Sequence, residues 1–490
     1  MKHTYDFNSN REDKKRPSTD YNGTKKYSMD EAIYLTGKGR FNILIILLSG
    51  LVLMGATIEN ISIAFVLPYA NCDLNMTTSE TGLASSIAFL GFVVSSHLWG
   101  FICDTAGRKK VIKIASTFSL IFAILSAFSV NAISIIILRF FVGIFISGLL
   151  ASVFSYASEF HTRESAPKAA SFVSMFMPMI FIYSSVIGLL VIPMNWSVNL
   201  IFIKFVPWRL YIILITSVNA INTLAFSFLP ESPKFLLAVN KPDEALDVLR
   251  NMYEINTGNI KEGYPVYYLI PEENTNNLLA TKGFVNIMKL VWKQTKPIFV
   301  PPYLDSTVKL CFIVFTLFAV GHGSVMCEQN CDIDNSNTTT FMIMLSIGIV
   351  FTILSALISF CLDKIRPRIL VPTWIIISSI AALAINFLTH FYSIVITFIT
   401  FVSSSLCAAI VSAISVSLYP TNIRAMATCF IFMFGRIGGL AGGNLIGVLL
   451  EHNCSLIFNV FAALSLICAF VFLMIKKEIP TPNTTNNCSA

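Results

Sequence analysis

Charged side chains inside long apolar segments are the residues of this chain best suited to chemistry. Three such residues occur, Glu59, Arg139 and Arg436, and Asn60 stands beside the first of them. A charge inside a bilayer costs roughly 2.5–3.5 kcal/mol on insertion scales, so each is expected to face a partner, an ion or a solute. Glu59 can bind a cation, accept a proton or pair with Arg139. We expect these four residues to line a substrate or ion pathway; the alternative is a structural ion pair buried between helices.

The segment Gly100-Phe-Ile-Cys-Asp104-Thr-Ala-Gly107-Arg108-Lys-Lys carries the most specific pattern in the sequence. Asp104 falls at the end of an apolar run, where the negative pole of a helix disfavours a carboxylate. Arg108 or the N-terminus of a neighbouring helix would stabilise it, and Gly100 and Gly107 allow close approach and a tight turn. Such a contact, formed in one conformation only, would act as a latch. The plainer alternative is a cluster of basic residues that fixes orientation in a membrane.

Related charged pairs follow other apolar runs. Glu159 precedes Arg163, and Tyr419-Pro420-Thr421 precedes Arg424 at the equivalent place in the second half of the chain. We therefore predict a conformational latch made by Gly100, Asp104, Gly107, Arg108, Glu159, Arg163 and Arg424.

Small and polar residues suggest further roles. A four-residue spacing of glycine, at Gly435, Gly439, Gly443 and Gly447, predicts a smooth helix face that another helix can approach closely. His97 is interpreted as a packing residue rather than a proton shuttle.

Asparagine and cysteine bear on the face exposed to the exterior or a lumen. Sequons at Asn75, Asn195, Asn337 and Asn453 are the candidate glycosylation sites. Cys327 and Cys331 lie together in the same predicted loop, where either a local disulfide or two free thiols would be consistent with their spacing.

The elements that position these residues are apolar helices. Hydrophobic residues make up 55% of the 490 residues and charged residues only 12%, a balance that one soluble core could not bury. The apolar runs are long enough for helices that cross about 30 Å of hydrocarbon. Their residues do not alternate between apolar and polar, as the strands of a membrane barrel would. We predict twelve spans, at 41–70, 81–102, 111–130, 134–155, 169–192, 206–228, 308–325, 339–362, 369–388, 391–414, 428–450 and 454–475.

Basic residues predict the orientation of these spans. All of the 34 Lys and Arg residues except Arg139, Lys204, Arg209 and Arg436 fall in the tails and on one side of the predicted membrane. This side is expected to be cytoplasmic, with both termini on it. The net charge of +7 then follows from topology, and no nucleic-acid partner is inferred. Residues 1–40 are polar and charged, so we expect no signal peptide and insertion by the first span.

The spans divide into two halves. We predict a cytoplasmic tail at 1–40, a six-helix bundle at 41–229, a cytoplasmic linker at 230–302, a second six-helix bundle at 303–475 and a tail at 476–490. Within the linker, 241–254 is predicted to form a short amphipathic helix, and the rest a loop; its apolar side holds Ala245, Leu246, Val248, Leu249 and Met252. Repeated halves are typical of transporters in which one bundle rocks against the other.

Several motifs support a resemblance to a known family. The resemblance rests on the pattern G-x-x-x-D-x-x-G-R-K at 100–109 and on four further segments: Phe65-Val-Leu-Pro68, Phe154-Ser-Tyr-Ala-Ser-Glu159, Pro230-Glu-Ser-Pro-Lys-Phe235 and Leu418-Tyr-Pro-Thr-Asn-Ile-Arg424. The chain resembles the major facilitator superfamily, and within it the synaptic vesicle glycoprotein 2 group and related organic-ion and sugar porters. The resemblance implies an all-α membrane protein of two pseudo-symmetric halves.

The sequence departs from that group at three places. The loop after the seventh span, about 325–339, is too short to hold the long lumenal domain of synaptic vesicle glycoproteins. Ala56 stands where relatives tend to carry an acid in the first span, although Glu59 remains. Arg366-Pro367 replaces the Gly-Arg expected in the second-half loop.

Motifs of enzymes are not found in the sequence. There is no nucleotide-binding loop, no nucleophile elbow and no metal-ligand spacing, so we expect neither an enzyme nor a cofactor. The expected function is secondary transport of a small solute, an organic ion or a sugar-like molecule, with a coupling proton or ion. We expect a monomer embedded in the lipid bilayer of the plasma membrane or of a secretory or synaptic-type vesicle. The alternative is a non-transporting protein of carrier fold that acts as a vesicle component, receptor or regulator.

Overall fold

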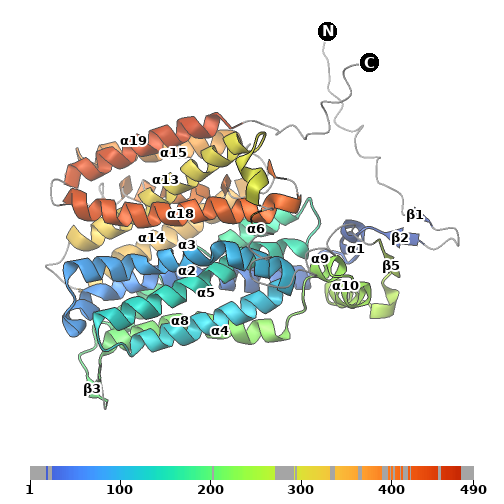
Figure 1. Cartoon of the computed structure of the whole chain (residues 1–490), viewed down its shortest axis with the longest axis horizontal. Helices are drawn as coiled ribbons and strands as arrows, with labels where there is room; N and C mark the ends of the chain where they lie inside the picture. The colour runs from blue at the N-terminus through green and yellow to red at the C-terminus, as the bar shows by residue number, and fades with distance from the viewer. Residues whose placement is uncertain are drawn as a thin grey trace, which may run out of the picture.

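Two bundles of long helices lie side by side in the computed structural model (Figure 1). The structure describes residues 18–19, 25–200, 203–270, 292, 295–331, 337–361, 367–388, 396–397, 399–400, 403–408, 410–411, 418–419, 421–450 and 454–475. The first half contains α2 (Arg40–Leu74), α3 (Thr78–Ala106), α4 (Arg108–Ala127), α5 (Ala132–Glu159), α6 (Ala166–Ser174), α7 (Met179–Val191) and α8 (Pro207–Phe228). The second half contains α13 (Leu304–Cys331), α14 (Asn337–Cys361), α15 (Pro367–Ile385), α18 (Thr421–Leu450) and α19 (Cys454–Leu473).

Polar caps fix where several helices begin. Thr77 accepts a hydrogen bond from the Glu80 backbone at 3.3 Å, and the Glu80 carboxylate accepts one from the Thr77 backbone at 2.8 Å. Asn131 caps α5 in the same way, its Oδ1 accepting from the Ser134 backbone at 2.8 Å. These capping boxes satisfy backbone donors at the ends of apolar helices, where the chain turns back.

The described helices agree with the predicted spans. Eight are long and apolar enough to cross a bilayer, and three shorter apolar helices run over Phe341–Leu357, Ile369–Ile385 and Phe430–Gly442. The predicted fifth span is divided into α6 and α7 just before Pro178, because proline lacks the amide that would continue the helix. Most of the predicted span 391–414 lies outside the described residues, which include only η3 (Ser403–Leu406) as an element there.

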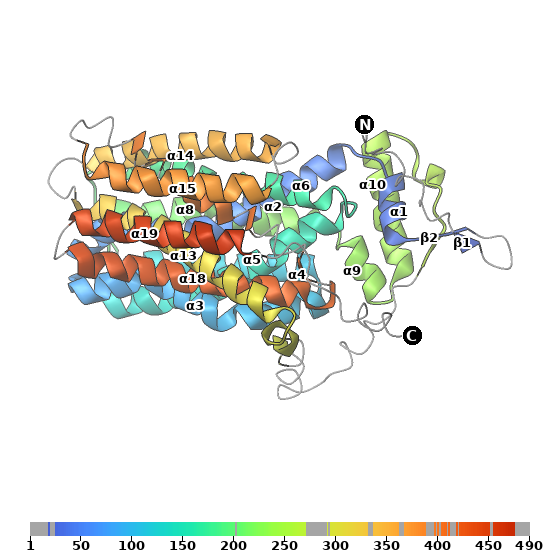
Figure 2. The ribbon, with the colours of Figure 1, turned by 90° about the horizontal axis from the view of Figure 1, so that it is seen from above.

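The linker and the N-terminal segment form a small unit at one end of the bundles, here called the linker end (Figure 2). The predicted linker helix is confirmed as α10 (Pro242–Thr257), with the predicted apolar side buried. The expectation that the rest is loop was wrong for α9 (Pro233–Ala238), η1 (Lys261–Gly263), β5 (Tyr268–Leu269) and η2 (Lys296–Phe299). Segment 1–40 is not wholly a tail either. It contributes β1 (Ser18–Thr19), β2 (Lys25–Tyr27) and α1 (Met29–Leu35), and β2 pairs with both β1 and β5.

Three hydrophobic clusters show how the halves meet. At the end opposite the linker, residues of both halves share one cluster, in which Phe65 and Tyr211 of the first half contact Phe341 of the second. At the linker end each half has its own cluster, except that Phe101 of α3 joins the cluster of the second half. Contacts between the halves run along α3 with α18 and α7 with α14. The halves are therefore joined most extensively at one end.

Candidate functional site

Glu59 of α2 and Arg139 of α5 form a buried ion pair in the first half. Arg139 Nη1 lies 3.4 Å from Glu59 Oε2 and 3.3 Å from the Glu59 backbone oxygen. The two side chains are 1% and 0% exposed, so water screens neither charge. Removing one partner would leave an uncompensated charge, which costs far more than the net stability of the pair.

Two residues of α8 complete the surroundings of this carboxylate, and no sequence pattern predicted them. Thr216 donates to Glu59 Oε1, and Asn219 Nδ2 lies 3.4 Å from the same oxygen. Arg139 Nε and Nη2 are buried and have no hydrogen-bond partner among the described residues. Thr216 and Asn219 lie about one turn apart on α8, but such spacing is too common in apolar helices to have singled them out.

Asn60, although next to Glu59 in the chain, is not part of this pair in the described structure, and neither is Arg436, which lies elsewhere. Asn60 is 2% exposed, and neither atom of its side-chain amide has a described partner. An orphaned buried amide costs free energy unless water or a ligand satisfies it.

Arg436 of α18 lies where the two halves meet. Its guanidinium is 5.0 Å from the ring centre of Phe92, 5.9 Å from that of Phe89 and 5.1 Å from that of Phe318. Phe89 and Phe92 belong to α3 and Phe318 to α13. The residue is 3% exposed, and within the described part of the chain no acid forms an ion pair with it. Aromatic faces attract the cation but leave its charge uncompensated.

Some of the residues predicted to form a latch lie together at the linker end. Arg108 Nη2 lies 3.2 Å from Asp104 Oδ1, and its Nε lies 3.0 Å from Glu159 Oε1. Arg108 also stacks on the ring of Phe235, 4.9 Å away. Gly100 is buried one turn before Asp104.

A fourth charged residue, Glu231 of the linker, joins this group of charges; in the sequence it stood out only as part of a family motif. Glu231 Oε1 accepts a hydrogen bond from the backbone of Lys109 at 3.0 Å. Gly107 adopts a φ of +104°, and a Cβ there would lie 2.5 Å from Glu231 Oε2. The glycine is thus required both by its backbone conformation and by the approaching carboxylate.

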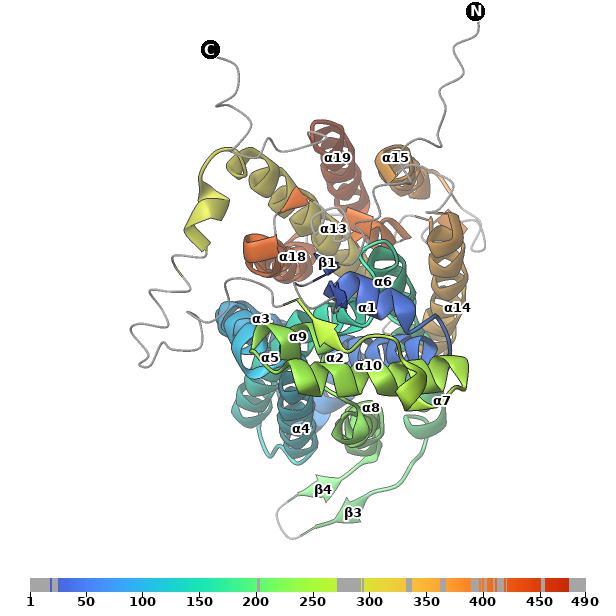
Figure 3. The ribbon, with the colours of Figure 1, turned by 90° about the vertical axis from the view of Figure 1, so that its right-hand side faces the viewer.

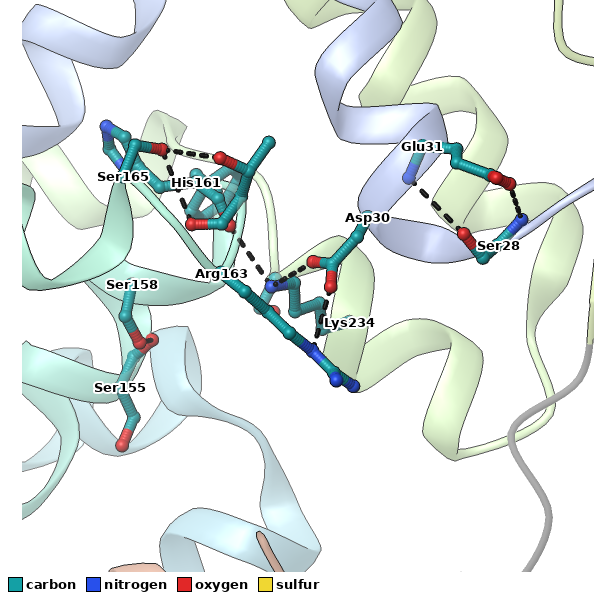
Figure 4. Close-up of polar contacts among 12 residues, drawn as sticks. Ser28, Asp30, Glu31, Ser155, Ser158, His161, Arg163, Ser165 and Lys234 are labelled. Atoms are coloured by element: carbon teal, nitrogen blue, oxygen red, sulfur yellow. Dashed lines mark hydrogen bonds and ion pairs between the residues drawn. The ribbon is translucent and has the colours of Figure 1, made fainter. Parts of the chain in front are cut away.

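Arg163 belongs to a different cluster from Arg108, so the structure does not bring the whole predicted latch together. It lies 2.8 Å from Asp30 of α1, and Lys234 of α9 lies 3.2 Å from the same carboxylate (Figure 4). Lys234 also donates to the carbonyl of His161 at 3.1 Å. The Ser28–Glu31 capping box that starts α1 was a readable signal for this missed element. The Arg424 side chain lies outside the described residues.

His161 is a buried titratable group in this cluster, just beyond the end of α5. Its Nδ1 lies 2.8 Å from the Ala157 carbonyl. Burial lowers the pKa of His161; the hydrogen bond to Ala157 opposes that shift, and the nearby Lys234 and Lys38 add to it. The neutral form is therefore favoured in the folded protein.

Glycines bring helices close together in both halves. In α18, Gly435 faces Val314 and Phe318, while Gly438 and Gly442 face the backbone of α13. The close approach thus follows a register different from the predicted four-residue spacing after Gly435, although Gly439 is also buried. The packing around Gly443 and Gly447 lies outside what the structure describes.

The remaining predicted residues are peripheral to these charged groups. Asn75 and Asn195 are exposed, as glycosylation requires. His97 packs edge-on against Phe430, with ring centres 5.9 Å apart. Nothing is described for Asn453 or for the side chains of Asn337, Cys327 and Cys331, so the glycosylation and disulfide predictions there stay predictions.

The family follows from the sequence model that the chain matches. The model of the Major Facilitator Superfamily matches residues 45–327, and the chain belongs to this family. It has the all-α fold of this family, that of a multi-pass membrane protein with about twelve helices.

Curated relatives match somewhat more than half of the chain. Human synaptic vesicle glycoprotein 2C is 31% identical over 298 residues, which are 57% of this chain and 41% of the relative. Mouse synaptic vesicle glycoprotein 2B is 28% identical over 298 residues, 57% of this chain and 44% of the relative. The matched region thus spans less than half the length of these relatives.

Solved structures share the fold across most of the chain. The proton:xylose symporter XylE bound to 6-bromo-6-deoxy-D-glucose has a TM-score of 0.66 at 13% identity, covering 88% of this chain and 94% of XylE. The inward-open conformation of the xylose transporter XylE from E. coli has a TM-score of 0.65 at 13% identity, covering 90% and 98%. At this identity the likeness concerns the fold alone.

Proposed function

We propose that this chain is a secondary transporter that moves a small organic anion by alternating access. Arg436 is the observation that carries the proposal. It is buried where α3 of one half meets α13 and α18 of the other, it is ringed by phenylalanines, and no acid compensates its charge among the described residues. A carboxylate, sulfonate or phosphate on an otherwise apolar solute would supply the missing charge and stack against the rings.

The proposed movement is supported by the distribution of the hydrophobic clusters. One shared cluster joins the halves at the end opposite the linker, and separate clusters lie at the linker end. Rocking about the interface would exchange this arrangement for its opposite. In the proposal Asp104, Arg108, Glu159 and Glu231 stabilise one of the two states, and Arg163 and Arg424 act at the same membrane face.

Glu59 is proposed to couple transport to a proton or another cation. Its carboxylate is the acid of the buried pair with Arg139, so protonation or ion binding would change the pair between two arrangements. Asn60, whose amide has no hydrogen-bond partner among the described residues, is proposed to contact the solute or its water. Both termini are proposed to be cytoplasmic, and the protein to work as a monomer in the plasma membrane or a vesicle membrane.

Uptake into proteoliposomes tests the substrate class. Purified protein would be offered organic anions, organic cations and sugars, with and without a proton gradient. We expect saturable uptake of anions, reduced about 10–100-fold in Arg436→Gln because a charge-assisted contact contributes roughly 1.5–3 kcal/mol. Arg436→Lys should retain part of the activity. Arg250→Gln, which changes an exposed linker pair, is the matched control.

Two outcomes would contradict the proposal. Unchanged anion uptake by well-folded Arg436→Gln would remove Arg436 from the pathway. No flux of any solute by well-folded parent protein would favour the alternative, a non-transporting vesicle component, receptor or regulator, which the similarity to synaptic vesicle glycoproteins supports.

A further inference from the structure

A β-hairpin connects α7 to α8 at the end opposite the linker. Strands β3 (Val198–Asn199) and β4 (Lys204–Phe205) are antiparallel, with Val198 opposite Phe205 and Asn199 opposite Lys204. The Leu200 amide also donates to the Ile203 carbonyl at 2.9 Å, which extends the pairing toward the turn.

The hairpin is amphipathic. Because side chains alternate between the faces of a strand and paired residues share a face, one face carries Trp196, Val198, Leu200, Ile203 and Phe205. The stacked rings of Trp196 and Phe205, with centres 5.9 Å apart, are consistent with this assignment. The other face carries Ser197, Asn199 and Lys204.

Among the described residues, the base of the apolar face packs on protein while two side chains farther out are exposed. Phe205 contacts Phe128, which follows α4, with ring centres 5.8 Å apart. Farther out, Val198 is 53% exposed and Leu200 46% exposed. An apolar strand face open to water is unfavourable, so a partner of apolar chemistry is expected.

The position of the hairpin identifies that partner. Seen along the bundle, it extends outward past α8 and α4 rather than over the helix ends (Figure 3). In Figure 1 it lies level with the last turns of the spans. Exposed apolar side chains also occur at the same ends of neighbouring helices: Leu190 in the last turn of α7, Met194 just after it, and Val130 between α4 and α5.

We propose that this hairpin lies in the lipid interface of the leaflet opposite the linker, with its apolar face toward the acyl chains. Asn199 and Lys204 face the headgroups, where the ammonium group of Lys204 can contact lipid phosphate. The interface, unlike the hydrocarbon core, contains water for the outer backbone groups of the two strands. The hairpin thereby holds the α7–α8 connection at a fixed depth. This inference is independent of the transported solute.

Photocrosslinking tests the proposal. Benzoylphenylalanine would replace Leu200 or, as a matched control on the polar face, Asn199, in full-length protein reconstituted with an alkyne-bearing phosphatidylcholine. We expect several-fold more lipid adduct at position 200 than at position 199, and the same preference at position 198 over 199. Size-exclusion elution would verify that each variant is folded.

The same variants irradiated in native membranes distinguish a protein partner from lipid. Equal lipid adducts at positions 199 and 200 would overturn the proposal. Adducts of position 200 with another protein chain, in place of lipid, would also overturn it and assign the apolar face to a protein interface.

Discussion

Four basic residues lie away from the predicted cytoplasmic side, and each has a different environment. Arg139 pairs with Glu59, and Arg209 lies 2.8 Å from Asp73. Lys204 is exposed on the hairpin, and Arg436 has aromatic rings but no acid beside it among the described residues. The first two are neutralised within the protein, which leaves Arg436 as the basic group best placed to attract a solute.

The Glu59–Arg139 pair predicts a pattern of stabilities. Glu59→Gln should lower the free energy of unfolding by about 3–5 kcal/mol, because it leaves the buried guanidinium of Arg139 without a compensating charge. Glu59→Gln combined with Arg139→Leu should recover most of this loss. Melting temperatures in detergent would measure both effects. A single variant that melts like the parent would show that the pair is not buried as described.

His161 predicts a pH dependence of stability. Its pKa is lowered by folding, so the unfolded chain binds a proton more readily than the folded one. The free energy of unfolding is therefore highest above the unfolded pKa of about 6.5, and it decreases as the pH falls below that value. His161→Gln should flatten the profile of melting temperature between about pH 5 and 7. An identical profile for parent and variant would contradict the assignment.

At the scale of elements, the turn between α3 and α4 shows what a short connection must satisfy. Gly107 is the only residue between the two helices, and there Arg108, Glu159 and Glu231 come together from separate elements. Spacing alone predicted Arg108 near Asp104, but it could not predict that the linker would add Glu231 and Phe235.

Gly107→Ala should impair this turn more than a comparable change elsewhere. Gly258 has a φ of +76° with no atom within 4 Å of a Cβ built there, so Gly258→Ala costs only backbone strain, about 1–3 kcal/mol. Gly107→Ala introduces a similar backbone strain, and its Cβ also displaces Glu231. We expect a lower melting temperature and slower uptake for Gly107→Ala than for Gly258→Ala. Equal effects of the two substitutions would show that the contact with Glu231 does not contribute to the need for glycine at position 107.

At the scale of the whole molecule, the two halves meet through α3 with α18 and through α7 with α14. Phe181 of α7 and Phe351 of α14 are in edge contact across this second interface, with ring centres 6.3 Å apart. If transport requires the halves to separate there, a covalent link at this contact must stop it.

Paired cysteines joined by a short bifunctional reagent test this movement. Linking Phe181→Cys to Phe351→Cys should reduce flux to background, whereas linking Phe122→Cys to Phe141→Cys within the first half should not. The parent chain treated with the reagent controls for its eleven native cysteines. Undiminished flux through the linked halves would contradict alternating access.

The sequence by itself determined the class of protein and most of the spans, because the length and apolarity of a segment decide whether it can cross a bilayer. It also identified Glu59, Arg139 and Arg436, since a charge in such a segment is conspicuous. Only the tertiary structure decided which charges pair. Partners such as Thr216, Glu231 and Asp30 lie far away in the chain, and no local pattern records a contact made between separate helices.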